Sequence, residues 1–278
     1  MGFVEFLSYD FAQRALAAGV LVALITAALG LFLVLKRMAL IGDSLSHVAL
    51  SGVALGLITN LSPVFVAMPV VMASSLAVYK ISQSAKVYAD SALGIVSAAG
   101  LSSGLIIAAL AGGFNVDLLS FLFGSILAVS GAELALALVL AVLIFGFIYL
   151  FYNELTALVF DEDFAQTAGV KVRRLNIALV LISAAAVVIA LKVAGIMLVS
   201  AMIILPPCAA LQLAENFKRA LFLSCALSVA GVVLGVYAAF LLNLPSGAVI
   251  ILIDLLILAL CAGVKKYAFK KRILTKAD

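Results

Sequence analysis

The chain has 278 residues, of which 67% are hydrophobic and 11% are charged, and its formal net charge is +4. Soluble globular domains contain about 45–50% apolar and about 25% charged residues, so this composition excludes a soluble domain and indicates a membrane protein that crosses the bilayer several times. The three cysteines are odd in number and lie within apolar runs, which argues against a disulfide framework. The small basic excess gives no reason to expect a nucleic-acid partner.

Apolar segments long enough to cross a bilayer follow one another along most of the chain. A spanning helix needs about 20 consecutive, mostly apolar residues. On that rule we predict an all-α, polytopic membrane protein with about nine transmembrane helices (eight or nine), forming a single integral domain over residues 1–278. The predicted spans are 15–35, 40–58, 62–81, 91–112, 131–151, 175–194, 196–214, 220–242 and 246–264.

Lysine and arginine gather on one side of this nine-span arrangement. Basic residues near span ends stay preferentially in the cytoplasm, so we expect the N-terminus outside and the C-terminus in the cytoplasm. Arg14 and Lys192 are exceptions, whose long side chains can reach the opposite interface. The basic residues on the expected cytoplasmic side are Lys36, Arg37, Lys80, Lys86, Lys171, Arg173, Arg174, Lys218, Arg219 and the tail from Lys265 to Lys276.

Residues 113–130, on the expected outer side, contain the run VDLLSFLFGSILAV. The run is too apolar for a plain loop and too short for a span, so we expect a re-entrant or interfacial helix that neighbouring protein buries. If this segment crossed the bilayer, or if the short boundary at Gly195 were absent, the number of spans would change by one. The N-terminus would then lie on the other side.

Asp43 and His47, the sole histidine of the sequence, lie in the predicted span 40–58. Ionisable side chains inside a span are costly and normally face a protein interior or a watery path. Residues four apart share a helix face, so Asp43, His47 and Ser51 form a polar stripe. A carboxylate and an imidazole one turn apart suit zinc, iron or manganese ions. The alternative is structural, with Asp43 capping the helix and His47 hydrogen-bonded to a neighbouring helix.

Two ligands do not complete a metal site. A twofold homodimer would bring two copies of the pair together, or another span would supply a further ligand. Asp254, deep in the last predicted span, is one candidate, although it could instead pair with a hydroxyl or backbone group for structure. Ser51 and Cys208 are further candidates.

Small residues predict where helices pack closely. Beside the polar stripe, Gly52 and Gly56 form a second stripe that lets another helix approach. The spaced pairs Gly100-x-x-x-Gly104 and Gly231-x-x-x-Gly235 predict close contacts in two other spans.

The segment Phe160–Val170, FDEDFAQTAGV, is a charged insert between spans on the expected cytoplasmic side. It predicts a short helix that Asp161 caps and that ends at Gly169 in the left-handed conformation. Its apolar residues are Phe160, Phe164, Ala165 and Ala168, and two exposed phenylalanines on such a helix indicate a partner surface. The alternative is a helix that lies in the lipid headgroups.

Pro206 and Pro207 interrupt the predicted span 196–214. Each removes a backbone donor and clashes with the preceding turn, so we expect the helix to kink or break there. The carbonyl groups that lose their partners could line a path or be satisfied by neighbouring helices.

With these residues in view, the chain resembles the permease subunits of bacterial ABC importers for zinc, manganese and iron, the family that includes ZnuB, MntB and TroC. The likeness runs nearly from end to end. The blocks that carry it are LKRMALIGDSLSHVALSGVALG at 35–56, DLLSFLFGS at 117–125, FDEDFAQTAGVKV at 160–172, AGIMLVSAMIILPPCAA at 194–210 and LPSGAVIIL at 244–252.

The resemblance implies a type II ABC importer-like permease that works as a homodimer. It implies a separate cytoplasmic ATPase subunit that binds the ATP, and an extracytoplasmic metal-binding protein that delivers the cargo. It also implies that Asp43 and His47 contact the metal and that 161–170 is the coupling helix, with ATPase contacts through Phe160, Asp161, Glu162, Phe164, Ala165 and Gly169. The sequence has no G-x-x-x-x-G-K-[S/T] phosphate loop, which agrees with a chain that is not itself the ATPase and binds no cofactor of its own.

The transported ion is expected to be zinc first, with manganese or iron next. Zinc-type members often carry an acid where this chain has Ser125, and some carry more histidines, which favours manganese or iron. Two other functions fit part of the sequence: a secondary cation transporter or channel without an ATPase, and an ABC permease for a metal chelate such as a siderophore. Tyr9-Asp10 and Gly42-Asp43 resemble parts of the motifs of membrane aspartyl proteases, but Tyr9-Asp10 precedes the first span and Leu40 stands where that motif has glycine. The sequence also has no H-E-x-x-H, so an intramembrane protease is disfavoured.

Overall fold

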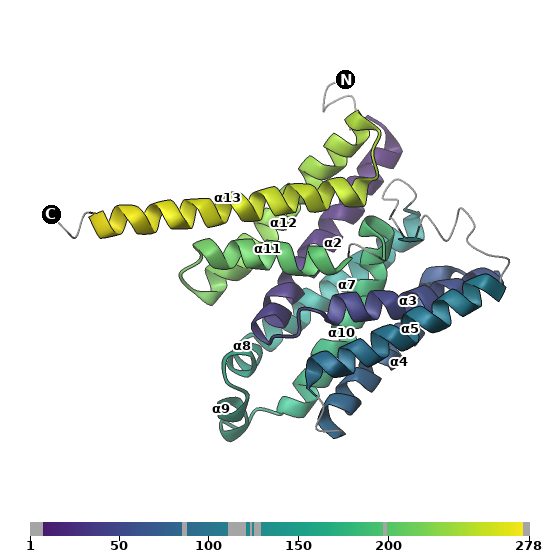
Figure 1. The fold of residues 1–278 in the computed structure, drawn as a ribbon, viewed down its shortest axis with the longest axis horizontal. Helices are drawn as coiled ribbons and strands as arrows, with labels where there is room; N and C mark the ends of the chain where they lie inside the picture. The colour runs from purple at the N-terminus through teal and green to yellow at the C-terminus, as the bar shows by residue number, and fades with distance from the viewer. Residues whose placement is uncertain are drawn as a thin grey trace.

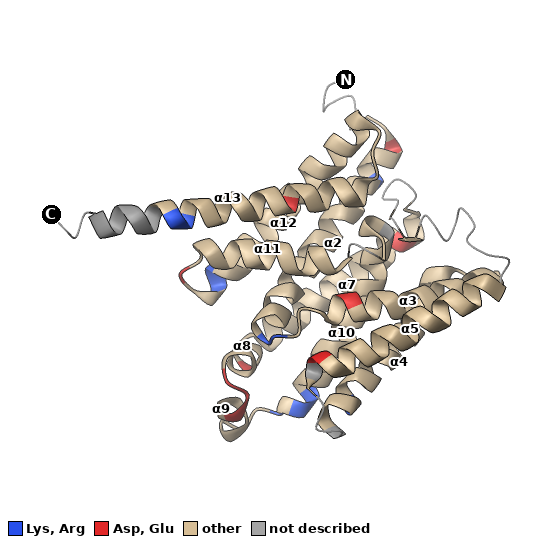
Figure 2. Ribbon diagram, viewed as in Figure 1, with Lys and Arg blue, Asp and Glu red and all other residues tan. Residues whose placement is uncertain are grey.

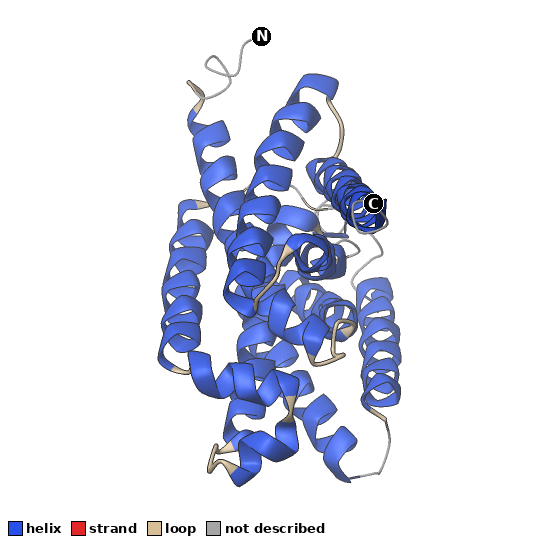
Figure 3. Cartoon of the chain, turned by 90° about the vertical axis from the view of Figure 1, so that its left-hand side faces the viewer, coloured by secondary structure: helices blue, strands red, loops and turns tan. Residues whose placement is uncertain are grey.

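The structure is a computed structural model that describes residues 8–84, 88–110, 121–122, 124, 129–196 and 199–274. Within these ranges the regular elements are all helices (Figure 1, Figure 3). In chain order they are α2 (Asp10–Leu35), α3 (Ile41–Ile58), α4 (Pro63–Ser84), α5 (Ala89–Leu110), α7 (Gly131–Leu150), α8 (Tyr152–Phe160), α9 (Glu162–Thr167), α10 (Val172–Ala194), α11 (Val199–Leu213), α12 (Phe217–Leu242) and α13 (Ser246–Leu274).

Eight of the described helices are long and apolar enough to cross a membrane, which confirms the predicted all-α, multi-span architecture. The remaining predicted span, 196–214, corresponds to α11, an apolar helix of 15 residues. At about 1.5 Å per residue it extends about 22 Å, which is less than the thickness of a hydrocarbon core of about 30 Å. The boundary before it is a real break, because Gly195 adopts a positive φ of 85° that ends α10.

The two largest differences from the predicted spans are at α8 and at the end of α13. The prediction had no helix at α8, whose Leu155 and Leu158 are buried against the rest of the protein. The last helix continues ten residues past the predicted end, to Leu274. Lysine and arginine are good helix formers, so a basic tail can continue a helix after the apolar run has ended.

The long helix α2 runs through the middle of the molecule and packs against α7, α10, α11 and α12, as Figure 1 shows. Its side chains Ile25, Leu29 and Phe32 are almost completely buried. Helix α3 packs between α4 and α5, and Ile41 and Leu45 at its start are fully buried. The helix that holds the polar stripe is therefore enclosed on most of its circumference.

The predicted glycine contacts on α3 are confirmed by the packing of α4. An ideal Cβ built on Gly52 would lie 2.6 Å from the Cα of Ala67, and one on Gly56 would lie 2.7 Å from the Cα of Pro63. Real side chains do not tolerate such distances, so the two backbones are close because both positions are glycine.

Both spaced glycine pairs also mark close helix contacts. An ideal Cβ on Gly100 of α5 would lie 2.6 Å from the Cα of Val48, and one on Gly104 would lie 2.9 Å from the Ser51 nitrogen. An ideal Cβ on Gly235 of α12 would lie 2.7 Å from the Cα of Ile250 of α13.

Pro206 and Pro207 do not break α11, since the helix continues through both to Leu213. Of the two expected outcomes, the break is therefore wrong, and the kink stays a prediction. Pro207 has no N–H to give to the carbonyl of Ile203 one turn earlier. That carbonyl instead faces α2, where an ideal Cβ on Gly30 would lie 2.1 Å from the Ile203 oxygen.

Most of the segment 113–130, predicted to be re-entrant, lies outside the described residues. Two of its described positions touch the junction between α10 and α11. The Ile196 nitrogen donates a hydrogen bond to the Phe121 oxygen at 2.9 Å, and Gly124, with a φ of 76°, lies against the backbone of Ala194 and Gly195.

Lysine and arginine gather around α8, α9, the connection from α11 to α12 and the distal part of α13 in Figure 2. One basic position lies near the opposite end, on α2. The described basic residues thus follow the one-sided pattern on which the predicted orientation rests.

Candidate metal-ion site and coupling region

Asp43 and His47 lie one turn apart at the start of α3. The Nε2 atom of His47 is 3.7 Å from Oδ2 of Asp43, and the side chains are 23% and 46% exposed respectively. This distance is an electrostatic contact and too long for a good hydrogen bond. The pair forms a half-open polar position at the end of a helix that is otherwise buried.

The structure weakens the purely structural explanation of this pair. Leu40, and not Asp43, occupies the N-cap position of α3, and it makes no side-chain capping bond. Nδ1 of His47 is buried and has no hydrogen-bond partner among the described residues. Buried polar atoms are normally paired with protein, water or ligand, so this imidazole is available for a further partner.

Ser51 lies on the same face one turn beyond His47 and is buried. Its hydroxyl donates to the backbone oxygen of Val48 at 2.7 Å, so only its oxygen lone pairs remain for a cation. Ser51 therefore completes the polar stripe as a neutral oxygen.

Asp254 and Cys208 are not brought to the Asp43–His47 pair in a single chain. Among the described residues, no group of three or more His, Cys, Asp or Glu side chains is close enough to hold a metal ion. Asp254 instead lies between α13 and α12, where one of its oxygens is 1.9 Å from the ideal Cβ position of Gly231. Cys208 is half-buried in α11, just after the two prolines.

Asp254 is 2% exposed, and its Oδ2 has no hydrogen-bond partner among the described residues. We expect Asp254→Asn to leave metal uptake within about twofold of wild type and to leave the protein at least as stable, because an amide of the same shape avoids a buried carboxylate. Uptake assays and thermal unfolding in detergent measure the two effects. A large loss of uptake in a folded Asp254→Asn protein would contradict this prediction and indicate that Asp254 takes part in metal transport.

Helix α9 has the local structure that the sequence predicts. Oδ1 of Asp161 accepts a hydrogen bond from the Phe164 nitrogen at 2.9 Å and caps the helix. Gly169 ends it with a φ of 85°, and the Val170 nitrogen bonds the Ala165 oxygen at 3.0 Å. This is the pattern of a Schellman C-cap.

The apolar residues of this segment do not share one buried face. Ala165 is completely buried, whereas Phe160 and Phe164 are 67% and 63% exposed. The Phe160 ring also lies 6.0 Å from that of Phe217 at the start of α12. The two exposed phenylalanines form an apolar surface at the end of α8 and on the side of α9 that faces away from the rest of the protein.

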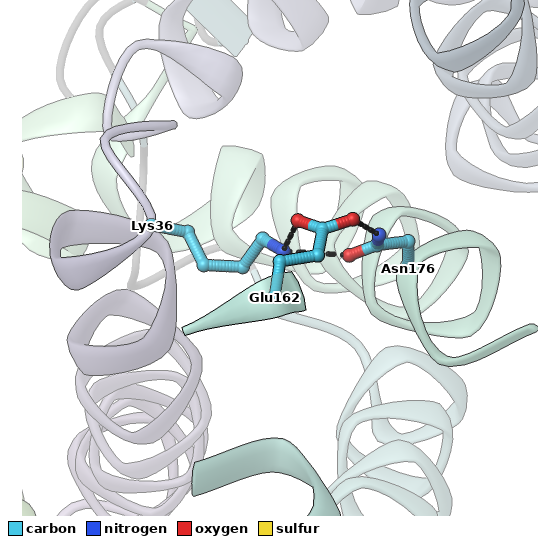
Figure 4. Close-up of polar contacts among 3 residues, drawn as sticks. All are labelled: Lys36, Glu162 and Asn176. Atoms are coloured by element: carbon cyan, nitrogen blue, oxygen red, sulfur yellow. Dashed lines mark hydrogen bonds and ion pairs between the residues drawn. The ribbon is translucent and has the colours of Figure 1, made fainter. Parts of the chain in front are cut away.

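Lys36, Glu162 and Asn176 form a polar network that the sequence reading missed (Figure 4). Lys36 Nζ lies 3.2 Å from Glu162 Oε2 and donates to Asn176 Oδ1 at 2.7 Å. Asn176 Nδ2 donates to Glu162 Oε1 at 2.8 Å. From the sequence, Lys36 served only to predict the orientation of the chain in the membrane. Nothing in the sequence indicates that its partner is Glu162, 126 positions further along the chain.

These features define a class of protein: an all-helical, multi-span membrane protein with a polar site inside one of its helices. The chain matches the ABC 3 transport family over residues 8–264. It therefore belongs to this family of transport permeases, which confirms the family that the sequence blocks indicate.

Similar proteins include two curated bacterial permeases. The chain is 34% identical to the manganese transport system membrane protein MntC of Halalkalibacterium halodurans over 258 residues, covering 93% of this chain and 88% of that protein. It is 27% identical to the high-affinity zinc uptake system membrane protein ZnuB of Haemophilus influenzae over 208 residues, covering 75% and 80%.

The fold is also similar to a solved structure, PsaBC from Streptococcus pneumoniae in complex with Fab. The TM-score is 0.86 at 28% identity, and the match covers 97% of this chain and 100% of that chain.

Proposed function

We propose that the chain is the membrane permease subunit of an ATP-driven importer for divalent transition metal ions. The observation that carries the proposal is the Asp43–His47 pair within α3, with its half-open carboxylate and its buried, unpartnered imidazole nitrogen. Membership of the ABC 3 transport family supports a transport role for these side chains. A moving ion must be released again, so a sparse site suits this function better than a closed cage of four ligands.

Manganese is the first candidate ion and zinc the second. A carboxylate with an imidazole admits both. The manganese relative is more similar to this chain than the zinc relative, at 34% against 27% identity and over more of the chain. This order reverses the one expected from the sequence, in which zinc came first. Uptake of radioactive manganese in competition with unlabelled zinc and iron tests it, and preferential inhibition by zinc would restore the earlier order.

A homodimer would supply the ligands that one chain lacks. Asp43 and His47 lie on the side of α3 where Leu40 and Ile58 are also exposed, so a second copy facing this side would add two more ligands. Alternating access would open this position first to one side of the membrane and then to the other. The one-sided basic residues support a cytoplasmic C-terminus, and the N-terminus lies outside only if α11 crosses the membrane as a ninth span.

Helix α9 is the proposed docking helix for a separate cytoplasmic ATPase, because Phe160 and Phe164 present an apolar surface next to acidic residues. We expect Phe164→Glu to abolish co-purification of the ATPase subunit, since a charge would be buried in the interface. Tyr88→Glu is the matched control, because Tyr88 is an exposed aromatic residue outside α9. It should retain the ATPase.

Uptake measurements with and without the ATPase separate the two other functions. A chain that takes up metal without any ATPase would be a secondary transporter or channel. A complex that imports a ferric siderophore and ignores the free ion would be a chelate permease.

A further inference from the structure

The polar network of Lys36, Glu162 and Asn176 joins three elements that are far apart in sequence. Lys36 is the C-cap residue of α2, Glu162 is the first residue of α9 and Asn176 lies in the first turns of α10 (Figure 4). The Lys36 side chain is 8% exposed, and Asn176 is also buried, whereas the Glu162 side chain is 46% exposed. A buried ammonium group holds an ionised partner strongly, because loss of that partner would leave an uncompensated charge.

The α2 side of this network is connected to the start of α3 by a short turn that backbone hydrogen bonds hold at both ends. The Arg37 nitrogen bonds the Val34 oxygen at 3.1 Å and the Met38 nitrogen bonds the Leu33 oxygen at 2.8 Å, which is a Schellman motif with Arg37 at a positive φ of 58°. The Ile41 nitrogen then bonds the Met38 oxygen at 3.0 Å, and α3 begins. Because this turn is short and hydrogen-bonded, a displacement of Lys36 should move Asp43 as well.

The α9 side of the network is connected to the exposed surface of that helix. Glu162 and Ala165, three residues apart, face the body of the protein, and Ala165 is completely buried. Phe164 faces outward. A cleft of about 870 Å³ lies beside Glu162 and Asn176, between α9, α10 and the end of α4, so close packing does not hold α9 on this side.

We infer that Lys36, Glu162 and Asn176 are positioning residues that carry a displacement of α9 to the turn between α2 and α3, and so to Asp43 and His47. This inference rests on the proposed function, because it takes α9 to be the helix that the ATPase moves. The alternative is that the network only braces the fold. A brace would affect stability and all activities together, whereas a mechanical link sets how much transport each ATP hydrolysis produces.

The test is the ratio of metal uptake to ATP hydrolysis in the complete complex of permease, ATPase and binding protein, reconstituted in liposomes. We expect Lys36→Met to assemble normally and to hydrolyse ATP within about twofold of wild type, while uptake per ATP falls about tenfold. Glu162→Gln should lower the ratio similarly, measured in complexes that retain the ATPase, because Glu162 also lies beside the proposed docking surface. The double exchange Lys36→Glu with Glu162→Lys should recover part of the ratio, since Asn176 can turn its amide to serve either order.

The matched control is the ion pair between Glu215 and Arg219 at the start of α12, whose side chains are 79% and 64% exposed. Glu215→Gln removes the same charge from an exposed pair and should leave the ratio unchanged. If Glu162→Gln does not fold, Asn176→Ser carries the test, because it keeps the ion pair and should lower the ratio about threefold.

A ratio that stays at the wild-type value in folded Glu162→Gln, or in Asn176→Ser where that variant replaces it, would overturn the inference. So would uptake and hydrolysis falling in proportion. Failure of the proposed function looks different, since the wild-type chain would then show no ATP-dependent uptake before any variant is compared.

Discussion

Replacement of Asp43 or His47 by alanine is expected to lower ATP-driven metal uptake by at least about tenfold, since even indirect disturbance of a metal ligand typically lowers affinity or activity by that much. The two side chains are the proposed metal ligands, and they combine a carboxylate oxygen with an imidazole nitrogen. The measurement is the initial rate of manganese and zinc uptake by the reconstituted complex, with the amount of folded permease determined in parallel.

Ser46→Ala is the matched control for this experiment. Ser46 is buried in the same turn, but its hydroxyl donates to the backbone oxygen of Asp43 at 2.7 Å and so is used within the helix. We expect it to keep most of the uptake, because alanine is the best helix former. Uptake that is the same in wild type, Asp43→Ala and His47→Ala would show that cargo does not pass this pair.

The sequence was sufficient to predict most of the helices, because each span is a local property of about 20 apolar residues. The caps of α9 were equally predictable, since Asp161 and Gly169 act on their own neighbouring backbone. The glycine pairs on α3, α5 and α12 were also informative, because a missing side chain shows where another backbone can approach. The sequence did not predict which helix packs against each glycine pair.

Contacts between distant segments account for what the sequence did not predict. Lys36 and Asn176 are separated by 140 positions, and their hydrogen bond exists because α2 and α10 pack side by side. Asp254 looked like a candidate ligand because it is a lone acid in a span, but its place is set by the packing of α13 on Gly231. The prolines of α11 indicated a break, and the glycine opposite them on α2 makes an intact helix possible.

Two contacts near the start of α3 connect the surroundings of Asp43 and His47 to other helices. Gly42 at its start meets the Ile203 side chain of α11, with an ideal Cβ 2.7 Å from Cδ1. Lys36 precedes it and is bound to α9 through Glu162. The Asp43–His47 pair follows both contacts directly along the chain, so small movements of α9 or α11 would both change its surroundings.

Gly30→Ala is expected to destabilise the protein by about 1–3 kcal/mol or more, the usual cost of forcing extra atoms into a packed interior. Its Cβ would lie 2.1 Å from the Ile203 oxygen and 3.0 Å from Cγ of Pro207. The oxygen belongs to backbone and cannot turn aside, so α2 and α11 would have to separate. Thermal unfolding of the purified protein in detergent should show a transition several degrees lower.

Gly146→Ala supplies the comparison, because among the described residues no atom of another helix lies within 4 Å of its ideal Cβ position near the end of α7. It should stabilise the helix by about 0.5–1 kcal/mol, since alanine has the higher helix propensity. Both variants add one methyl group to a glycine in an apolar helix, and they differ in what that group meets. If the Gly30→Ala protein were as stable as the Gly146→Ala protein, α11 could not pack against α2 as closely as the short distance between Gly30 and the Ile203 carbonyl indicates. The intact helix through Pro206 and Pro207 would then need another explanation.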